Sequence, residues 1–312
     1  MLQHETIDAI KRSASIPSMP MVATRCYEMT QKSDCDYAQL VALLSTDPGI
    51  AADVLRLSNS ALFGVTRQVG SLKQAITLLG VKRIRELVLA RYLVQQMHGN
   101  GTDIVDLSYY WRRSLATAIL ASKFAETLCP AQRDEAFIGG LLADVGVVVM
   151  ARALPKVYAP VAARYKPHES DEWLQGEYNL MGVTHGEVSA LVIEQWGLPD
   201  SLVQAVRYHH CSATEMPAKV EGIILARAIG GAQMIGKILS ETTDVSKAVN
   251  ACTQSMIRVN LNTNVLIKAL DGIDAEIRNV ADLLKVEVLN SKIFATLGRQ
   301  LVENLHAVEM VV

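Results

Sequence analysis

Apolar residues recur at helical spacing along most of the chain, and this periodicity constrains the fold more than any other feature of the sequence. Alternation of apolar and polar residues, which is typical of strands, is scarce, and aromatic residues make up only 5% of the chain. We therefore predict an all-α protein. With 312 residues, half of them hydrophobic, the chain can bury one large core or two closely associated domains.

Start and stop signals predict individual helices in the first hundred residues. Asp47-Pro48 fits an N-cap followed by the first helical residue, which predicts a helix over about 48–59. Ser71 and Gly80 bracket a short amphipathic segment. A longer helix with one basic face is expected over 81–97, and Gly99-Asn100-Gly101 then predicts a subdomain boundary.

A second group of helices is predicted after this boundary, over 107–128, 134–154, 184–197 and 200–210, the third of them starting with a capping box at Thr184 and Glu187. An apolar helix follows over about 218–239, then a polar region, then a final amphipathic helix with Ile293, Leu297 and Leu301. We thus expect a lead-in over 1–15, an N-terminal helical part over 16–98, a bundle over 106–211, and a helical extension over 212–312 that packs on the bundle.

Charge and cysteine usage exclude several classes of function. A formal net charge of -2 and a pI near 6.4 give no general attraction to nucleic acid or to anionic membranes. The five cysteines are odd in number and widely spread, which argues against a disulfide framework or a zinc ribbon. The first fifteen residues lack the apolar segment of a signal peptide, so we expect a cytoplasmic protein.

One carboxylate interrupts the longest apolar stretch, which runs over residues 136–151. The stretch is shorter than the ~20 residues of a membrane-spanning helix, so we predict a buried core helix in which Asp144 must be paired, hydrogen-bonded or neutral. Three of the seven histidines, His185, His209 and His210, follow in the same half of the chain. Imidazoles and a carboxylate that converge from different helices can form a hydrolytic metal site.

Seven short segments occur in a specific order along the chain. They are IPSMP at 16–20, TDPGI at 46–50, LSNSALFG at 57–64, AI and LG at 75–76 and 79–80, YWRRS at 110–114, GLLADVG at 140–146, and QWGLP at 195–199. This order resembles the HDOD family, an output domain related to the HD and HD-GYP metal-dependent phosphohydrolases. The resemblance covers roughly residues 16–211 and implies an HD-related bundle with an N-terminal helical subdomain.

The resemblance also implies that the metal site is degenerate. The related hydrolases carry a histidine just before the serine of the YWRRS segment and a His-Asp pair in the GLLADVG segment, where this chain has Arg113 and Ala143. A guanidinium in the first position would repel a divalent cation. We therefore expect a vestigial pocket in which Arg113 pairs with Asp144 in place of a metal; its members are Arg113, Asp144, His185, His209 and His210. Arg227 stands where a later aspartate would be expected.

Each of these residues also has a purely structural interpretation. His185 would then be a helix-start residue satisfied by solvent or backbone. His209 and His210 diverge by ~100° on a helix, so both can face one pocket only if the helix ends there. Otherwise His210 would supply a favourable charge at the helix C-terminus. Asn59 and Ser60 either cap a helix or contact a partner. Arg83 and Arg85 either contact a partner or a phosphate, or lie on a solvated helix face.

The resemblance to the HDOD family, taken together with these residues, implies three possible functions. The first is a non-catalytic bacterial signal-transduction module that has no cofactor and contacts other signalling proteins, with a homodimer left open. The second is a metal-dependent phosphohydrolase acting on a nucleotide or cyclic dinucleotide, with Fe, Mn or Mg held by Asp144, His185, His209 and His210. The third is a binder of a nucleotide second messenger that uses Arg113 to hold phosphate without hydrolysing it.

Overall fold

The structure is a computed structural model that describes residues 1, 3–13, 15–16, 18–31, 34–59, 68–98, 104–163, 172–212, 215–217, 222–241, 244–287, 299–300 and 303–304. All regular elements in these ranges are helices, and no strand occurs among them, so the predicted all-α class is confirmed. The chain forms two compact units. The N-terminal unit comprises Pro17–Asn100 and Asn279–Val286, and the bundle unit comprises Met1–Ile16, Gly101–Arg278 and Glu287–Val312.

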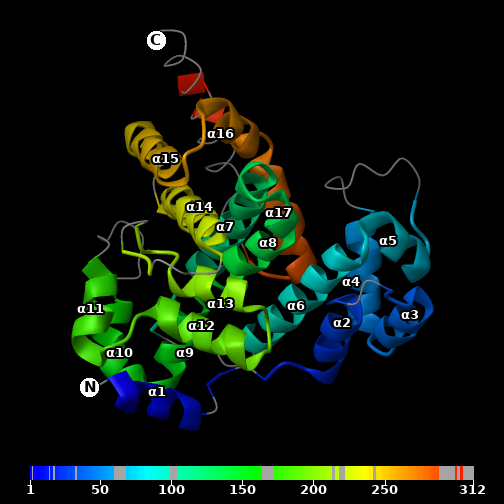
Figure 1. The fold of residues 1–312 in the computed structure, drawn as a ribbon, viewed down its shortest axis with the longest axis horizontal. Coiled ribbons are helices and arrows are strands. Elements are labelled where there is room, and N and C mark those ends of the chain that lie inside the picture. The colour runs from blue at the N-terminus through cyan, green and yellow to red at the C-terminus, as the bar shows by residue number, and fades with distance from the viewer. Residues whose placement is uncertain are drawn as a thin grey trace. The chain divides into compact units, whose positions relative to one another are not determined.

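Five helices build most of the N-terminal unit (Figure 1): α2 (Met21–Gln31), α3 (Tyr37–Ser45), α4 (Pro48–Ser58), α5 (Leu72–Leu79) and α6 (Val81–His98). α4, α5 and α6 begin where the sequence predicts, whereas α2 and α3 were not predicted. At the start of α4, the Asp47 carboxylate accepts hydrogen bonds from the backbone N–H groups of Gly49 and Ile50. Ser71 caps α5 in the same way, and Gly80 ends it with a positive φ of 79°.

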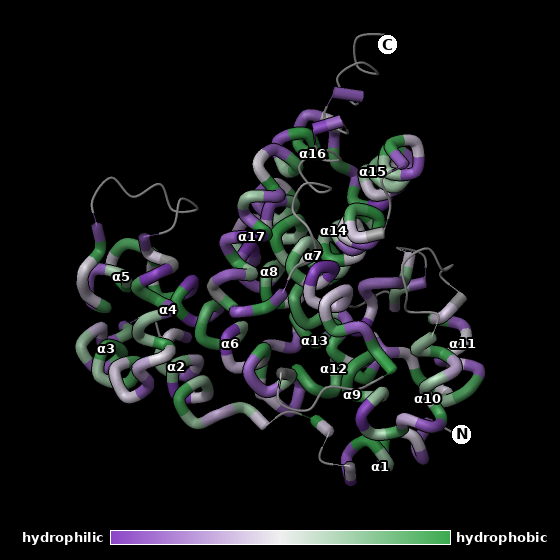
Figure 2. The backbone as a smooth tube through the Cα atoms, turned by 180° about the vertical axis from the view of Figure 1, so that it is seen from behind, coloured by the Kyte–Doolittle hydropathy of each residue, from purple (hydrophilic) through white to green (hydrophobic). Residues whose placement is uncertain are grey.

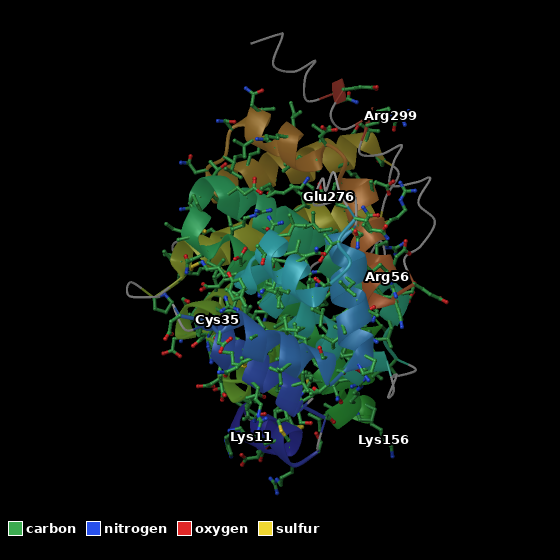
Figure 3. All side chains as sticks on the ribbon, turned by 90° about the vertical axis from the view of Figure 1, so that its right-hand side faces the viewer. Lys11, Cys35, Arg56, Lys156, Glu276 and Arg299 are labelled. Carbon is green, nitrogen blue, oxygen red and sulfur yellow. The ribbon has the colours of Figure 1, made fainter. Side chains whose placement is uncertain are left out.

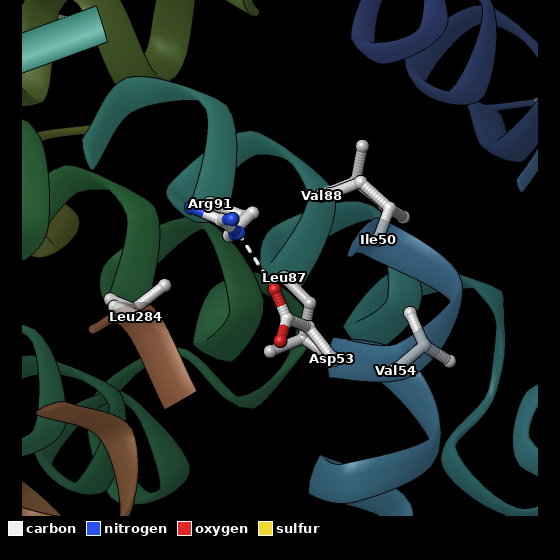
Figure 4. Close-up of a pocket in the computed structure, with 7 residues that line it drawn as sticks. All are labelled: Ile50, Asp53, Val54, Leu87, Val88, Arg91 and Leu284. Atoms are coloured by element: carbon white, nitrogen blue, oxygen red, sulfur yellow. Dashed lines mark hydrogen bonds and ion pairs between the residues drawn. The ribbon is translucent and has the colours of Figure 1, made fainter. Parts of the chain in front are cut away.

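A small cavity lies between α4 and α6 in this unit (Figure 4). Its volume of about 10 Å³ is close to the room that one water molecule needs. The lining includes an ion pair in which the Arg91 Nε lies 2.6 Å from Asp53 Oδ2. We regard the cavity as a packing feature, because it is too small for an organic ligand.

The bundle unit is built around α7 (Leu107–Leu128), which is buried on nearly all sides and packs along α8 (Arg133–Leu142) and α14 (Ile223–Glu241). Figure 2 shows hydrophobic residues gathered along these central helices. The other helices of the unit are α1 (Gln3–Arg12), η2 (Pro130–Gln132), α9 (Val145–Ala153), α10 (Pro155–Ala162), α11 (Glu172–Met181), α12 (His185–Gln195), α13 (Asp200–Arg207), α15 (Val245–Val259), α16 (Thr263–Leu270) and the first half of α17 (Ile273–Leu284).

The helix predicted over 134–154 is interrupted, so that part of the prediction is wrong. α8 ends at Leu142, α9 begins at Val145, and Asp144 lies at the junction between them. The Ser189 hydroxyl of α12 donates to the carbonyl of Ala143 and accepts from the N–H of Gly146, which satisfies the backbone groups that the break leaves free. A Cβ at Gly146 would collide with the carbonyl oxygen of His185, so this glycine allows α9 to approach α12.

Both ends of the chain contribute helices to the bundle unit. Residues 3–12 form α1, which packs near α9, and its Thr6 hydroxyl donates to the carbonyl of Met181 at 2.7 Å. The helix predicted over 218–239 is α14, but α15, α16 and α17 were not predicted. The expected last helix with Ile293, Leu297 and Leu301 falls outside the described residues.

Ionic side chains lie mainly at the periphery, as Figure 3 shows for Lys11 and Lys156. Glu276 of α17 pairs with Lys123 of α7 at 2.7 Å and so ties the start of α17 to the central helix. By length and composition, the stretches Pro130–Ala153 and Ile223–Ser240 resemble membrane-spanning helices. Their apolar windows are 83% and 61% buried inside the protein, which is usual for core helices.

Candidate functional site

The structure brings together all five residues of the predicted pocket, which we call the Asp144 cluster: Arg113, Asp144, His185, His209 and His210. They come from four places in the bundle unit. Arg113 is on α7, Asp144 at the α8–α9 junction, His185 at the first residue of α12, and the last two in the turn after α13. Segments that are up to 97 residues apart in sequence therefore share one site.

The carboxylate of Asp144 is surrounded by donors. Arg113 Nε lies 3.1 Å from Oδ2, and each of the two side chains is only 3% exposed, so the predicted ion pair is present. Gln233 of α14 donates to Oδ1 at 2.5 Å. The Nε2 atoms of His185 and His209 lie 3.4 and 3.7 Å from the same oxygen. This carboxylate is therefore compensated by the protein itself.

His185 is oriented by a second buried carboxylate. Its Nδ1 lies 2.8 Å from Glu177 Oε2, and the same oxygen accepts from the His185 backbone N–H at 2.7 Å. Its Nε2 lies 2.9 Å from Nε2 of His210. The capping box at Thr184 is present as predicted, but the ring is fully buried. His185 is therefore a helix-start residue, as its structural interpretation requires, but its ring contacts Glu177 and His210 and is not satisfied by solvent or backbone.

The two adjacent histidines both face His185, because α13 ends at Arg207 and a turn follows over 208–210. The ring centroids of His209 and His210 lie 5.5 and 4.8 Å from that of His185. His209 is buried and its Nδ1 contacts the carbonyl of Val206 at 2.5 Å, whereas His210 is half-buried. The helix end thus meets the condition for both side chains to share one pocket.

Sequence reasoning missed three neighbours of the cluster. Glu177 also accepts a hydrogen bond from the Tyr158 hydroxyl at 2.6 Å. Trp173, one turn earlier on α11, stacks on His185 at 4.2 Å between ring centroids, and the guanidinium of Arg113 lies 5.6 Å from its ring centroid. The i, i+4 spacing of Trp173 and Glu177 on one helix face was the only available signal. Gln233, the third, had none.

Arg227 does not take the place of the expected aspartate. Its Nε donates to the carbonyl of Arg258 at 3.0 Å. The contact between α14 and Asp144 comes from Gln233 instead, six residues further along the helix.

Opposite charges set the protonation of the cluster. Burial alone would raise the pKa of Asp144, but Arg113 and the two histidines hold it well below its usual range. Burial would lower the pKa of His185, but Glu177 and Asp144 raise it to about 9. Burial and the neighbouring His209 and His185 hold the pKa of His210 well below its usual range. Two cations, Arg113 and protonated His185, therefore balance two carboxylates.

The cluster fits a metal ion in donor type and spacing but not in charge. One donor atom each from Asp144, His185, His209 and His210 lies within 4.8 Å of the others, and three imidazoles with one carboxylate suit Zn, Mn or Fe. Arg113, however, already occupies one oxygen of the carboxylate. His185 would also have to lose a proton before it could act as a ligand. Both charges oppose a divalent ion in this arrangement.

The other predicted contact residues lie in the N-terminal unit and have internal partners. Asn59 accepts from the Val69 N–H at 2.7 Å and donates to its carbonyl at 2.9 Å, which fits a structural role. Arg85 lies over the ring of Tyr27, and with Arg91 it turns toward α2 and α4, so the single basic face predicted for α6 is not formed. Arg83 is half-buried, and Ser60 falls outside the described residues.

Comparisons with known proteins identify the family of the chain. The family described as the HDOD domain matches residues 16–212. The chain belongs to the HDOD family. An uncharacterized protein of Treponema pallidum (strain Nichols) is 25% identical over 209 residues, which cover 64% of this HDOD chain and only 38% of the Treponema protein.

Solved structures show the same fold over nearly the whole chain. A candidate phosphohydrolase from Shewanella amazonensis SB2B superposes with a TM-score of 0.66 at 21% identity, covering 94% of this chain and 97% of its own. An HDOD domain protein of unknown function from Geobacter sulfurreducens gives 0.63 at 21% identity, with 99% of both chains covered. A candidate signal transduction protein from Marinobacter aquaeolei VT8 superposes with a TM-score of 0.65 at 21% identity. The match covers 91% of this chain and 66% of the Marinobacter chain.

Proposed function

We propose that this HDOD protein is a non-catalytic signal-transduction module that acts in the cytoplasm through contacts with other signalling proteins. The observation that carries the proposal is the buried ion pair between Arg113 and Asp144. A permanent cation here takes the place of a ligand and neutralises the carboxylate that a metal would need.

The charge of the cluster opposes metal binding in two ways. A divalent ion at ligand distance from Asp144 would lie a few ångströms from the guanidinium of Arg113, and this repulsion is weakly screened in a buried site. A metal ion that displaced Arg113 from Asp144 would leave the buried guanidinium without its partner, which is also unfavourable. Ala143, at the position where the related hydrolases carry a histidine, supplies no ligand atom.

The burial of the cluster also argues against catalysis. Arg113, Asp144, His185 and His209 are each at most 2% exposed as whole residues, and within the cluster only His210 is half-buried. A catalytic metal keeps an open coordination position for water or substrate. A cluster packed in this way is better suited to hold four helical segments in a fixed arrangement.

A metal-dependent phosphohydrolase acting on a nucleotide or cyclic dinucleotide is the second candidate, and the spacing of the donor atoms favours it. Asp144, His185, His209 and His210 would hold the metal, and Glu177 would orient His185, as carboxylates behind metal-bound histidines do. The metal would supply an activated water. One relative carries a name of this kind and another is named for signal transduction, so the names support both candidates.

Calorimetric titration with Mn²⁺ separates the two candidates. We expect no binding by the wild-type protein and binding by the double variant Arg113→His, Ala143→His, which restores two imidazoles and removes the guanidinium. Arg278→His is the matched control, because this arginine is half-exposed on α17 and pairs with Asp274. Tight binding by the wild-type protein, together with turnover of a cyclic dinucleotide, would defeat the proposal.

A further inference from the structure

The first two helices after the region that matches the HDOD family, α14 and α15, contact the Asp144 cluster. The match ends at residue 212, and α14 and α15 begin after it. α14 supplies Gln233, the donor to Asp144 Oδ1. α15 supplies Arg258, whose Nη2 donates to the carbonyl of His209 at 2.7 Å and to the carbonyl of Cys211 at 2.8 Å.

These two carbonyls flank His210 in the chain, so Arg258 holds the turn that presents both histidines. Its guanidinium is half-buried, and its own backbone carbonyl accepts a hydrogen bond from Arg227 of α14. Arg258 is thus fixed at its backbone and at its guanidinium. Loss of the side chain would leave two partly buried carbonyl groups without their donor.

Two adjacent glycines allow this arginine to reach the turn. A Cβ at Gly230 of α14 would collide with the carbonyl oxygen of His209 and would also crowd the Arg258 guanidinium. A Cβ at Gly231 would collide with Val259 of α15. The carbonyl of Gly231 accepts a hydrogen bond from the Ser255 hydroxyl at 2.8 Å. α15 therefore crosses α14 at these glycines, beside the turn of the cluster.

We propose that Arg258 is a positioning residue that couples α15 to the state of the Asp144 cluster. This inference rests on the proposed signalling function, because it names the segment through which a change in the cluster is transmitted. A change in the charge of the cluster displaces the His209–His210 turn, and Arg258 passes this displacement to α15. The outer face of α15 is exposed and includes Ile257, which is 69% exposed, so the change reaches the protein surface.

Hydrogen exchange measured by mass spectrometry on the full chain tests this coupling. Arg113→Met removes the permanent cation of the cluster, and we expect several-fold faster exchange in the segment 250–259 than in the wild-type protein. In the background of Arg258→Met, the same Arg113→Met change should add no further increase. Arg278→Met is the matched control, since it removes a half-exposed arginine outside the cluster and should leave this segment unchanged.

Two results would overturn the inference: unchanged exchange in 250–259 after Arg113→Met, or an equal increase with and without Arg258. If circular dichroism shows that Arg113→Met is unfolded, Asp144→Asn is used in its place. If Arg258→Met is unfolded, Arg258→Lys is used instead. Metal analysis of the same wild-type preparation tests the proposed function separately. A wild-type protein that contains metal and still shows the coupling would defeat only the proposed function.

Discussion

The two units each contain a buried aspartate paired with arginine, and the comparison shows what distinguishes the Asp144 cluster. In the N-terminal unit, Asp53 pairs with Arg91, which is 17% exposed, and with Arg56, which is 52% exposed. In the bundle unit, Asp144 pairs with Arg113, which is 3% exposed, and three histidines lie around the pair. An arginine–aspartate pair alone therefore does not distinguish the Asp144 cluster. The distinguishing feature is a fully buried pair that is surrounded by imidazoles.

The largest effect is expected from Arg113→Ala. The substitution leaves Asp144 buried without its main partner, so we expect a loss of ~3–5 kcal/mol in the free energy of unfolding. Urea denaturation followed by circular dichroism measures this loss. A loss below ~1 kcal/mol would mean that the cluster relaxes to admit water, and it would weaken the contrast with the N-terminal pair.

The next effect concerns pH. The pKa of His185 is raised to about 9, above its ordinary value of 6.5, so its stabilising contribution is complete below pH 6.5 and is lost as the pH rises through 9. The wild-type protein should therefore lose up to ~3 kcal/mol more stability than His185→Gln between pH 6.5 and 10. Urea denaturation across this range measures the difference. Parallel pH profiles would show that His185 is neutral in the folded protein.

A smaller effect is expected from Arg91→Ala in the N-terminal unit. Arg91 makes a 2.6 Å contact with the buried Asp53, but Arg56 still pairs with the same carboxylate after the substitution. We expect a loss of ~1–2 kcal/mol in urea denaturation. A loss as large as that of Arg113→Ala would remove the distinction between the two pairs.

The smallest effect is expected from Arg56→Ala. This side chain is half-exposed and lies 3.4 Å from Asp53, so the pair is screened by water and contributes at most ~0.5 kcal/mol. The measurement is the shift of the urea midpoint relative to wild type. A clear shift would show that Asp53 depends on both arginines.

Sequence patterns predicted the all-α class and those helices whose starts and ends carry clear local signals, but not α1, α2, α3, α10, α11, α15, α16 or α17. Asp47, Ser71 and Thr184 cap helices where the sequence places them. The break at Asp144 could not be predicted, since apolar residues continue on both sides of it. That break depends on Ser189, which is 45 residues further along the chain and bonds to both sides of the junction.

The motifs predicted Arg113 and Asp144 as members of the Asp144 cluster, and residue type predicted His185, His209 and His210, but neither predicted the residues that hold the cluster. Glu177, Gln233 and Arg258 lie outside the recognisable segments, and each contacts the cluster only through the packing of another helix. Their roles follow from distance and burial. No spacing in the sequence indicates Gln233 or Arg258, and only the i, i+4 spacing from Trp173 bears on Glu177.

The most direct test of the account is the metal content of wild-type protein purified without chelator, measured by elemental mass spectrometry. The account predicts far less than one transition-metal ion per chain, because Arg113 already neutralises Asp144 in a buried site. One bound ion per chain would contradict it and would show that Asp144 and the three histidines hold a metal in spite of the arginine.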